Sequence, residues 1–493
     1  MLDRIQSLLP EGARALLDGP GLKAKAARGS FWLATGSGVD QALRLIRNII
    51  LTRLLAPEAF GLMAIIITVA GFMESFTDVG IGTAIVQNPR SEDPQYLNGA
   101  FWISVGRAAG LYALVLLSAP WVARFYHQPA MAGLMRVAFL EILFKGAASP
   151  QAAIASKKMD FKRLLIINQG AGLCGVVAAI AAAFALRGVW ALVIGIVVEY
   201  AVRCALSYAV CPFRPGLVFH KPSLRELYEY SRQMAGLPVL TFLFMRADIF
   251  VIGKICSAAD VGIYSMAAGL GTMATSALGN LMAQITGPTF SAMQKDHARL
   301  KNTLQRITSL LMLLIFPPTV FVALYGKELL HVLYGGAYAK AAVPFALLFG
   351  TAMLRVLSVP VVSLYFMIGQ PGLNRFFAIV RVLVMGVLIY PAAKWYGLTG
   401  AASAGLIAMT VGYACQLVRL RSIIGLDLRQ YKWVSWRPLA ISLPLVVVCV
   451  ATHHTFKLAP LTQMAIGATG CLSGYALAFF LRPRAEARYP YLP

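Results

Sequence analysis

A long apolar stretch reads DQALRLIRNIILTRLLAPEAFG (Asp40–Gly61), and it carries Arg44, Arg47 and Arg53. An arginine at the centre of a bilayer-spanning helix costs about 2.5–3.5 kcal/mol on insertion scales. With about 100° between successive residues, Asp40, Arg44 and Arg47 share one narrow face of a helix. A charged stripe of this kind cannot face lipid. The stretch therefore predicts a membrane helix whose charged face contacts protein or water.

Apolar residues dominate the rest of the chain as well. Of its 493 residues, 59% are hydrophobic and 13% are charged, and the mean hydropathy is +0.70. Soluble domains carry roughly 25% charged residues. The seven cysteines form no CxxC pair, so we expect packing roles for them and no metal site. The composition predicts an all-α integral membrane protein.

Apolar runs of about 20 residues set the number of membrane helices. They predict about fourteen, near 30–54, 58–82, 97–120, 131–150, 164–186, 189–211, 229–254, 261–286, 303–325, 341–368, 375–395, 398–419, 437–456 and 461–482. A segment at 1–29 and a tail at 483–493 flank them. The connections are too short for a soluble domain, and no DxD, Walker A, HExxH or GxSxG pattern stands in a suitable context. We therefore predict a transporter and not an enzyme, with no catalytic residue and no cofactor.

Lysines and arginines set the predicted orientation. With the N-terminus in the cytoplasm, about 26 of the 44 lie on the cytoplasmic side and about 8 on the outer side. The loop Ser156–Arg163 is the densest example. Both termini are thus predicted to be cytoplasmic. The formal net charge of +24 mostly reflects this asymmetry, so it requires no nucleic acid partner.

An internal repeat predicts the architecture. The segments ILTRLLAPEAFGLMA (Ile50–Ala64) and VIGKICSAADVGIYS (Val251–Ser265) align at an offset of 201 residues, which pairs Gly61 with Gly262. Six helices separate the copies, and an even number gives both the same orientation. The repeat predicts two six-helix lobes related by a parallel pseudo-two-fold axis. Their bounds are 30–211 for the N-lobe and 229–419 for the C-lobe, with two helices at 437–482 outside the repeat.

Five segments carry a family resemblance: LTRLLAPEAFGLMAI (51–65), FTDVGIGTAIVQ (76–87), MRADIFVIGK (245–254), AADVGIYSMA (258–267) and YGLTGAASAGLIA (396–408). They resemble the polysaccharide-exporter branch of the multidrug/oligosaccharidyl-lipid/polysaccharide transporter superfamily, in particular Wzx-type flippases. The resemblance implies alternating-access transport of an undecaprenyl-diphosphate-linked oligosaccharide repeat unit across the bacterial inner membrane. Exopolysaccharide, capsule or O-antigen assembly would follow outside. H⁺ or Na⁺, the lipid bilayer, a polysaccharide polymerase and chain-length proteins are the implied partners.

Charged residues inside the predicted helices supply the candidate site. Ten bases and six acids lie there, which leaves an excess of positive charge. Guanidinium groups bind phosphate oxygens in bidentate fashion, so a cationic cavity suits a diphosphate. The predicted substrate-binding residues are Arg44, Arg47, Arg107, Arg246, Arg355 and Arg381, and the predicted ion-coupling residues are Asp40, Glu74 and Asp248.

Two structural alternatives accompany this interpretation. Asp40 and Arg44 are spaced to form an ion pair that only holds helices together, and Glu141 can pair with Lys145 in the same way. Two other functions within the superfamily also compete, a lipid II flippase and a multidrug/ion antiporter. A cation-drug exporter would favour an acidic cavity, whereas the count here is basic.

Overall fold

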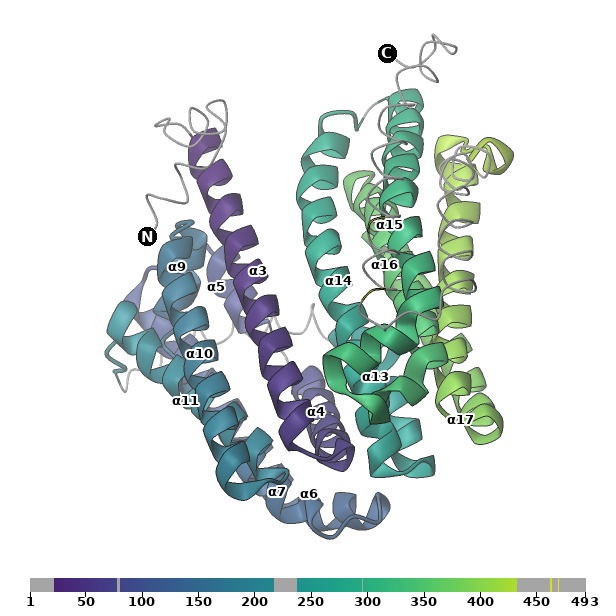
Figure 1. Ribbon diagram of the computed structural model, residues 1–493. Helices are drawn as coiled ribbons and strands as arrows, with labels where there is room; N and C mark the ends of the chain where they lie inside the picture. The colour runs from purple at the N-terminus through teal and green to yellow at the C-terminus, as the bar shows by residue number, and fades with distance from the viewer. Residues whose placement is uncertain are drawn as a thin grey trace. The chain divides into compact units, whose positions relative to one another are not determined.

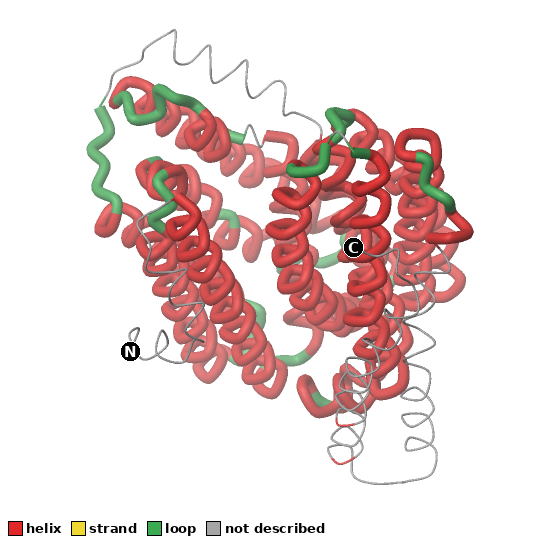
Figure 2. The backbone as a smooth tube through the Cα atoms, turned by 90° about the horizontal axis from the view of Figure 1, so that it is seen from above, coloured by secondary structure: helices red, strands yellow, loops and turns green. Residues whose placement is uncertain are grey.

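The computed structural model describes residues 22–77, 80–216, 237–294 and 296–431, together with 462 and 469. In this part every regular element is a helix and no strand is present (Figure 2). The predicted all-α class is therefore confirmed. The predicted helix 437–456, all but two positions of 461–482, and the tail 483–493 lie outside the described residues.

Eight stretches of the described residues are long and apolar enough to cross a membrane. They are α4 (Pro57–Thr77), α6 (Pro94–Phe125), α10 (Phe161–Leu186), α11 (Trp190–Val210), α14 (Ala258–Ser291), α15 (His297–Tyr334), η1 with α16 (Gly336–Ala341 and Ala342–Met367) and α17 (Pro371–Ile424). Short polar links begin several of them, and Asp93, Asp160 and Asp296 each accept a backbone N–H at the helix start. The chain is a multi-pass membrane protein, and the number fourteen stays a prediction.

The remaining helices are α3 (Leu22–Leu54), α5 (Ile81–Gln87), α7 (Met131–Ala138), α8 (Leu140–Ala147), α9 (Gln151–Lys157) and α13 (Leu237–Ile255). The single helix predicted near 131–150 is divided, because α7 ends before Phe139 and α8 begins after it. Helix α17 contains the two predicted helices 375–395 and 398–419. Gly397 separates them with a backbone φ of 55°, which glycine adopts without steric cost.

The chain divides into two compact units. The first comprises Met1–Leu55 and Ile66–Val239, and the second comprises Ala56–Ile65 and Leu240–Pro493. The division therefore passes through helix α4.

In the first unit, α3, α10 and α11 lie side by side (Figure 1). Small residues allow this close approach, because a Cβ atom on Gly175 of α10 would lie 2.6 Å from the Cβ of Glu199 on α11. Helices α8 and α6 approach in the same way, because a Cβ atom on Gly146 of α8 would lie 2.4 Å from the Cβ of Ala108 on α6. Small residues at helix crossings are typical of membrane bundles, where close backbone packing replaces the hydrophobic effect as the force between helices.

In the second unit, α14, α15, α16 and α17 form the bundle, with α16 packed against the other three (Figure 1). Fully or almost fully buried aromatic rings fill its core near η1. The rings of Tyr334 and Tyr338 lie 5.7 Å apart, and Phe60 of α4 meets Tyr338 edge-on at 6.4 Å. The first turns of α4 are thus built into the core of this unit.

Helices α4 and α14 touch backbone to backbone in the second unit. A Cβ atom on Gly61 would lie 1.8 Å from the carbonyl oxygen of Ala258, and one on Gly262 would lie 2.0 Å from that of Pro57. Both contacts obey the offset of 201 residues, since Gly61 corresponds to Gly262 and Pro57 to Ala258. The crossing of α4 and α14 therefore joins equivalent positions of the two repeat copies.

Candidate functional site

Helix α3 of the first unit places Asp40 and Arg44 one turn apart. Arg44 Nε donates to Asp40 Oδ2 at 2.9 Å. The Arg44 side chain is 43% exposed and the Asp40 side chain is 36% exposed. This pair realises the structural alternative raised by the spacing. Arg47, on the next turn, donates only to the Asn48 side chain at 3.4 Å, and it forms no ion pair with any described residue.

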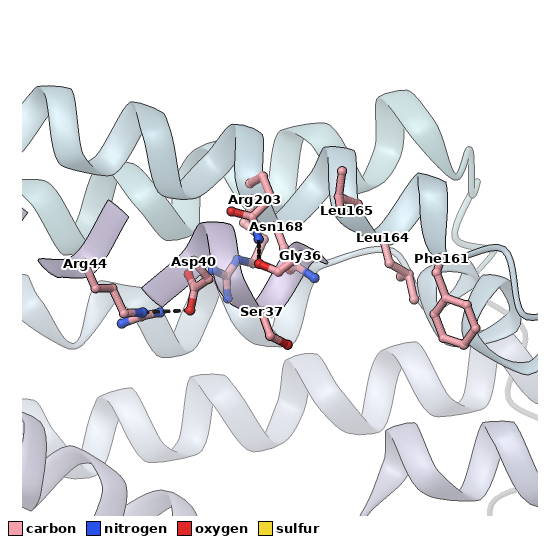
Figure 3. A pocket seen from close by; sticks show the side chains of 10 residues that line it. Gly36, Ser37, Asp40, Arg44, Phe161, Leu164, Leu165, Asn168 and Arg203 are labelled. Carbon is pink, nitrogen blue, oxygen red and sulfur yellow. Dashed lines mark hydrogen bonds and ion pairs between the residues drawn. The ribbon is translucent and has the colours of Figure 1, made fainter. Parts of the chain in front are cut away.

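A cavity of about 340 Å³ opens beside the Asp40–Arg44 pair, between α3, α10 and α11. Figure 3 shows Arg44 and Phe161 at opposite ends of the residues that line it, with Ser37, Asn168 and Arg203 between them. Gln169 Nε2 donates to the carbonyl oxygen of Gly36 at 2.8 Å, so this amide ties α10 to α3.

A network of charges joins α4, α8 and α11 in the same unit. Lys145 Nζ lies 3.0 Å from Glu74 Oε1 and 3.6 Å from Glu141 Oε1, so one ammonium serves two carboxylates. Arg203 pairs with Glu199 at 2.7 Å, and the Tyr200 ring lies under both cations, at 4.6 Å from Lys145 and 4.8 Å from Arg203. The predicted Glu141–Lys145 pair is confirmed. The sequence did not reveal that Glu74 shares this lysine.

Arg107 of α6 lies near that network. Its NH1 group donates to the carbonyl oxygen of Thr77 at 3.1 Å, while its buried Nε has no hydrogen-bond partner. Together with Lys145 it lines a second cavity of about 230 Å³ in the first unit. No carboxylate of the described residues forms an ion pair with Arg107.

The second unit brings Arg246, Asp248 and Arg355 to one small cavity of about 80 Å³. The carboxylate of Asp248 accepts hydrogen bonds from the Tyr264 hydroxyl and from the backbone N–H of Ile249, both at 2.8 Å. Within the described residues neither arginine forms an ion pair with Asp248. The acid is therefore already satisfied by neutral donors, and both guanidinium groups keep their hydrogen-bonding capacity.

Phe244 of α13 organises the cationic side of this cavity. The guanidinium of Arg355 lies 5.9 Å from the centre of its ring, and that of Arg381 lies 5.4 Å from it. An aromatic face attracts cations and stabilises each by about 0.5–2 kcal/mol. Gly412 leaves room for Arg381, because a Cβ there would lie 2.4 Å from its Cγ. Two like charges are thus held on one ring, and an anion would complete the arrangement.

The structure therefore groups the predicted residues into separate places. Arg246, Asp248, Arg355 and Arg381 gather in the second unit, Asp40 and Arg44 line the large cavity of the first, and Glu74 and Arg107 lie near Lys145. Sequence reasoning missed Phe244 and Tyr264. No spacing rule along the chain links them to Arg381 or Asp248, since these contacts join different helices.

Comparisons with known proteins agree with one another. A family model described as polysaccharide biosynthesis protein matches residues 50–343. The lipopolysaccharide biosynthesis protein WzxC of Escherichia coli K12 is 22% identical over 447 residues, covering 88% of this chain and 89% of that protein. The succinoglycan biosynthesis transport protein ExoT of Rhizobium meliloti is 24% identical over 323 residues, 65% of each chain.

Among solved structures, the lipid II flippase MurJ in an inward closed conformation is similar to this chain with a TM-score of 0.73. The match has 13% identity and covers 92% of this chain and 99% of MurJ. At this identity the likeness shows the shared fold alone.

Proposed function

This chain belongs to the polysaccharide biosynthesis protein family, as its Wzx-like motifs predicted, and we propose that it is a flippase for a lipid-linked oligosaccharide. The relatives bear the names of a lipopolysaccharide biosynthesis protein and a succinoglycan biosynthesis transport protein. The described part of this chain has eight helical stretches long and apolar enough to cross a membrane. The proposed substrate is an undecaprenyl-diphosphate-linked repeat unit, moved across the inner membrane for exopolysaccharide, capsule or O-antigen assembly.

One observation carries the proposal. In the second unit, Arg246 and Arg355 line a cavity whose one acidic lining residue, Asp248, is held by Tyr264. Arg381 lies beside this cavity, on the Phe244 ring that it shares with Arg355. Unpaired charges within an apolar bundle are costly, so a site of this kind is best explained by an anion that binds there during the working cycle. Guanidinium forks match the oxygens of a diphosphate in geometry as well as in charge.

The first unit supplies further candidates of unequal strength. Arg47 and Arg107 form no ion pair with a described residue, so they can add to the attraction for a diphosphate. Arg44 is a weaker phosphate ligand because Asp40 already neutralises it.

Alternating access of the two repeats would carry the head group across while the polyprenyl chain stays in lipid. A membrane potential that is negative inside favours expulsion of an anion by about 2.3 kcal/mol per charge per 100 mV. Asp40, Glu74 and Asp248 are proposed to couple the cycle to H⁺ or Na⁺, with a polymerase and chain-length proteins acting on the product outside.

A deletion strain tests this function. Loss of the protein should cause a lipid-linked oligosaccharide to accumulate, and mass spectrometry identifies its sugars. Wild-type protein should clear the accumulated lipid and restore surface polysaccharide, whereas the Arg355→Ala, Arg381→Ala double variant should do neither at equal membrane level. Full export by that double variant would refute the cationic site. Accumulation of lipid II instead of a polysaccharide precursor would favour the lipid II alternative.

A further inference from the structure

The cavity between α3, α10 and α11 differs in size from the cavity of the second unit that Arg246 and Arg355 line. It measures about 340 Å³, against about 80 Å³ for the cavity at Arg355. Small-molecule pockets begin at about 300 Å³, whereas one water molecule occupies about 30 Å³ of liquid. The first cavity is large enough for a ring-sized organic group, whereas the second is too small for one.

The two cavities also differ in charge. In the first unit, Arg44 is neutralised by Asp40 at 2.9 Å, and Arg203 is neutralised by Glu199 at 2.7 Å. The charged residues of the large cavity are therefore balanced, and they do not attract an anion strongly. They still present hydrogen-bond donors and acceptors at fixed positions, because each ion pair spans one turn of a helix.

Neutral polar groups complete the lining of the large cavity. Asn168 and Ser37 are exposed side chains that can both donate and accept hydrogen bonds. Gln169 is fixed by its bond to Gly36, and its Oε1 atom has no partner although it is buried. Phe161 adds an apolar ring at one end of the row (Figure 3). A mixture of donors, acceptors and one aromatic face, without net charge, suits a ligand with many hydroxyl groups.

We propose that this cavity binds a sugar ring of the transported head group. The inference rests on the proposed flippase function and assigns the saccharide to the first unit, while the phosphates are recognised by the arginines. Asn168 and Ser37 bond the hydroxyl groups, and Phe161 packs against the C–H face of the ring. The Asp40–Arg44 pair offers an acceptor and a donor side by side. Gln169 is a positioning residue that holds α3 against α10.

Two probes separate the saccharide site from the phosphate site. Purified protein in nanodiscs is titrated with undecaprenyl diphosphate, and separately with the lipid-linked saccharide that accumulates in the deletion strain. The variant Asn168→Ala should weaken binding of the lipid-linked saccharide about tenfold, because it removes one or two hydrogen bonds to the sugar hydroxyl groups. Its affinity for undecaprenyl diphosphate should stay within about twofold of the wild-type value.

Matched controls come from the same helix. Cys174 is an exposed residue of α10 that does not line the cavity, so Cys174→Ala should leave both affinities unchanged. Phe161→Leu should weaken binding of the saccharide probe alone, whereas Phe184→Leu, near the other end of α10, should weaken neither. Thermal unfolding of each variant verifies that it is folded. If Asn168→Ala does not fold, Ser37→Ala and Phe161→Leu carry the same test.

The outcomes distinguish this inference from the function on which it rests. If Asn168→Ala weakened binding of both probes equally, or of neither, the saccharide site would be overturned. The proposed flippase function would survive the loss of the saccharide site if Arg355→Ala still weakened binding of both probes. Wild-type protein that binds neither probe would overturn the function and the saccharide site together.

Discussion

Replacing Gly61 by alanine adds one methyl group where α4 and α14 meet. The new Cβ would lie 1.8 Å from the carbonyl oxygen of Ala258, and real Cβ contacts are essentially never below 3.0 Å. The crossing must therefore open by about 1.2 Å, the difference between those distances, and a backbone carbonyl cannot rotate away as a side chain can. Overpacking of this kind costs about 1–3 kcal/mol. The higher helix propensity of alanine relative to glycine offsets at most about 1 kcal/mol of this cost. We expect a net loss of stability.

The assay is thermal unfolding of the purified protein in detergent. The fraction of protein that elutes at the native position on gel filtration after heating reports unfolding. The matched control is Gly269→Ala. Gly269 lies two turns after Gly262 in α14, and a Cβ added there meets nothing within 4 Å. This control should be neutral or slightly more stable than the wild type. Gly262→Ala should behave like Gly61→Ala, because a Cβ there lies 2.0 Å from the Pro57 carbonyl oxygen.

The double variant sharpens the test. Both methyl groups open the same crossing, so the loss in the Gly61→Ala, Gly262→Ala variant should be smaller than the summed losses of the single variants. An apparent Tm of Gly61→Ala at or above that of Gly269→Ala would refute the close backbone contact.

Three further results are expected. Phe244→Leu removes the ring under two guanidinium groups and should weaken binding of undecaprenyl diphosphate several-fold by titration in nanodiscs, whereas Phe242→Leu on the same helix should not. Arg44→Ala should lower the free energy of unfolding by less than about 1 kcal/mol, since its pair with Asp40 is more than one-third exposed, and a double-mutant cycle with Asp40→Ala measures the coupling. A cysteine at Lys158 in a cysteine-free background should react with an impermeant thiol reagent only after permeabilisation, and labelling in intact cells would reverse the proposed orientation.

Much of the fold could be predicted from local sequence. Apolar runs identified every one of the eight long stretches, because a backbone in lipid must satisfy its hydrogen bonds within its own helix. The repeat aligned Gly61 with Gly262 as equivalent positions, and the contact between them is a finding of the structure. The division of the predicted helix near 131–150 was missed, since no proline or glycine marks the break at Phe139.

In the candidate site, contacts within one helix could be predicted from the sequence, and contacts between helices could not. Pairs within one helix, Asp40 with Arg44 and Glu141 with Lys145, follow from a spacing of one turn, and the sequence alone determined them. Only the tertiary structure decided that Glu74 shares Lys145 from a helix 71 residues away, and that Arg355 and Arg381 share Phe244. The period of a helix fixes which residues share a face, but the packing of small residues between helices fixes which faces meet.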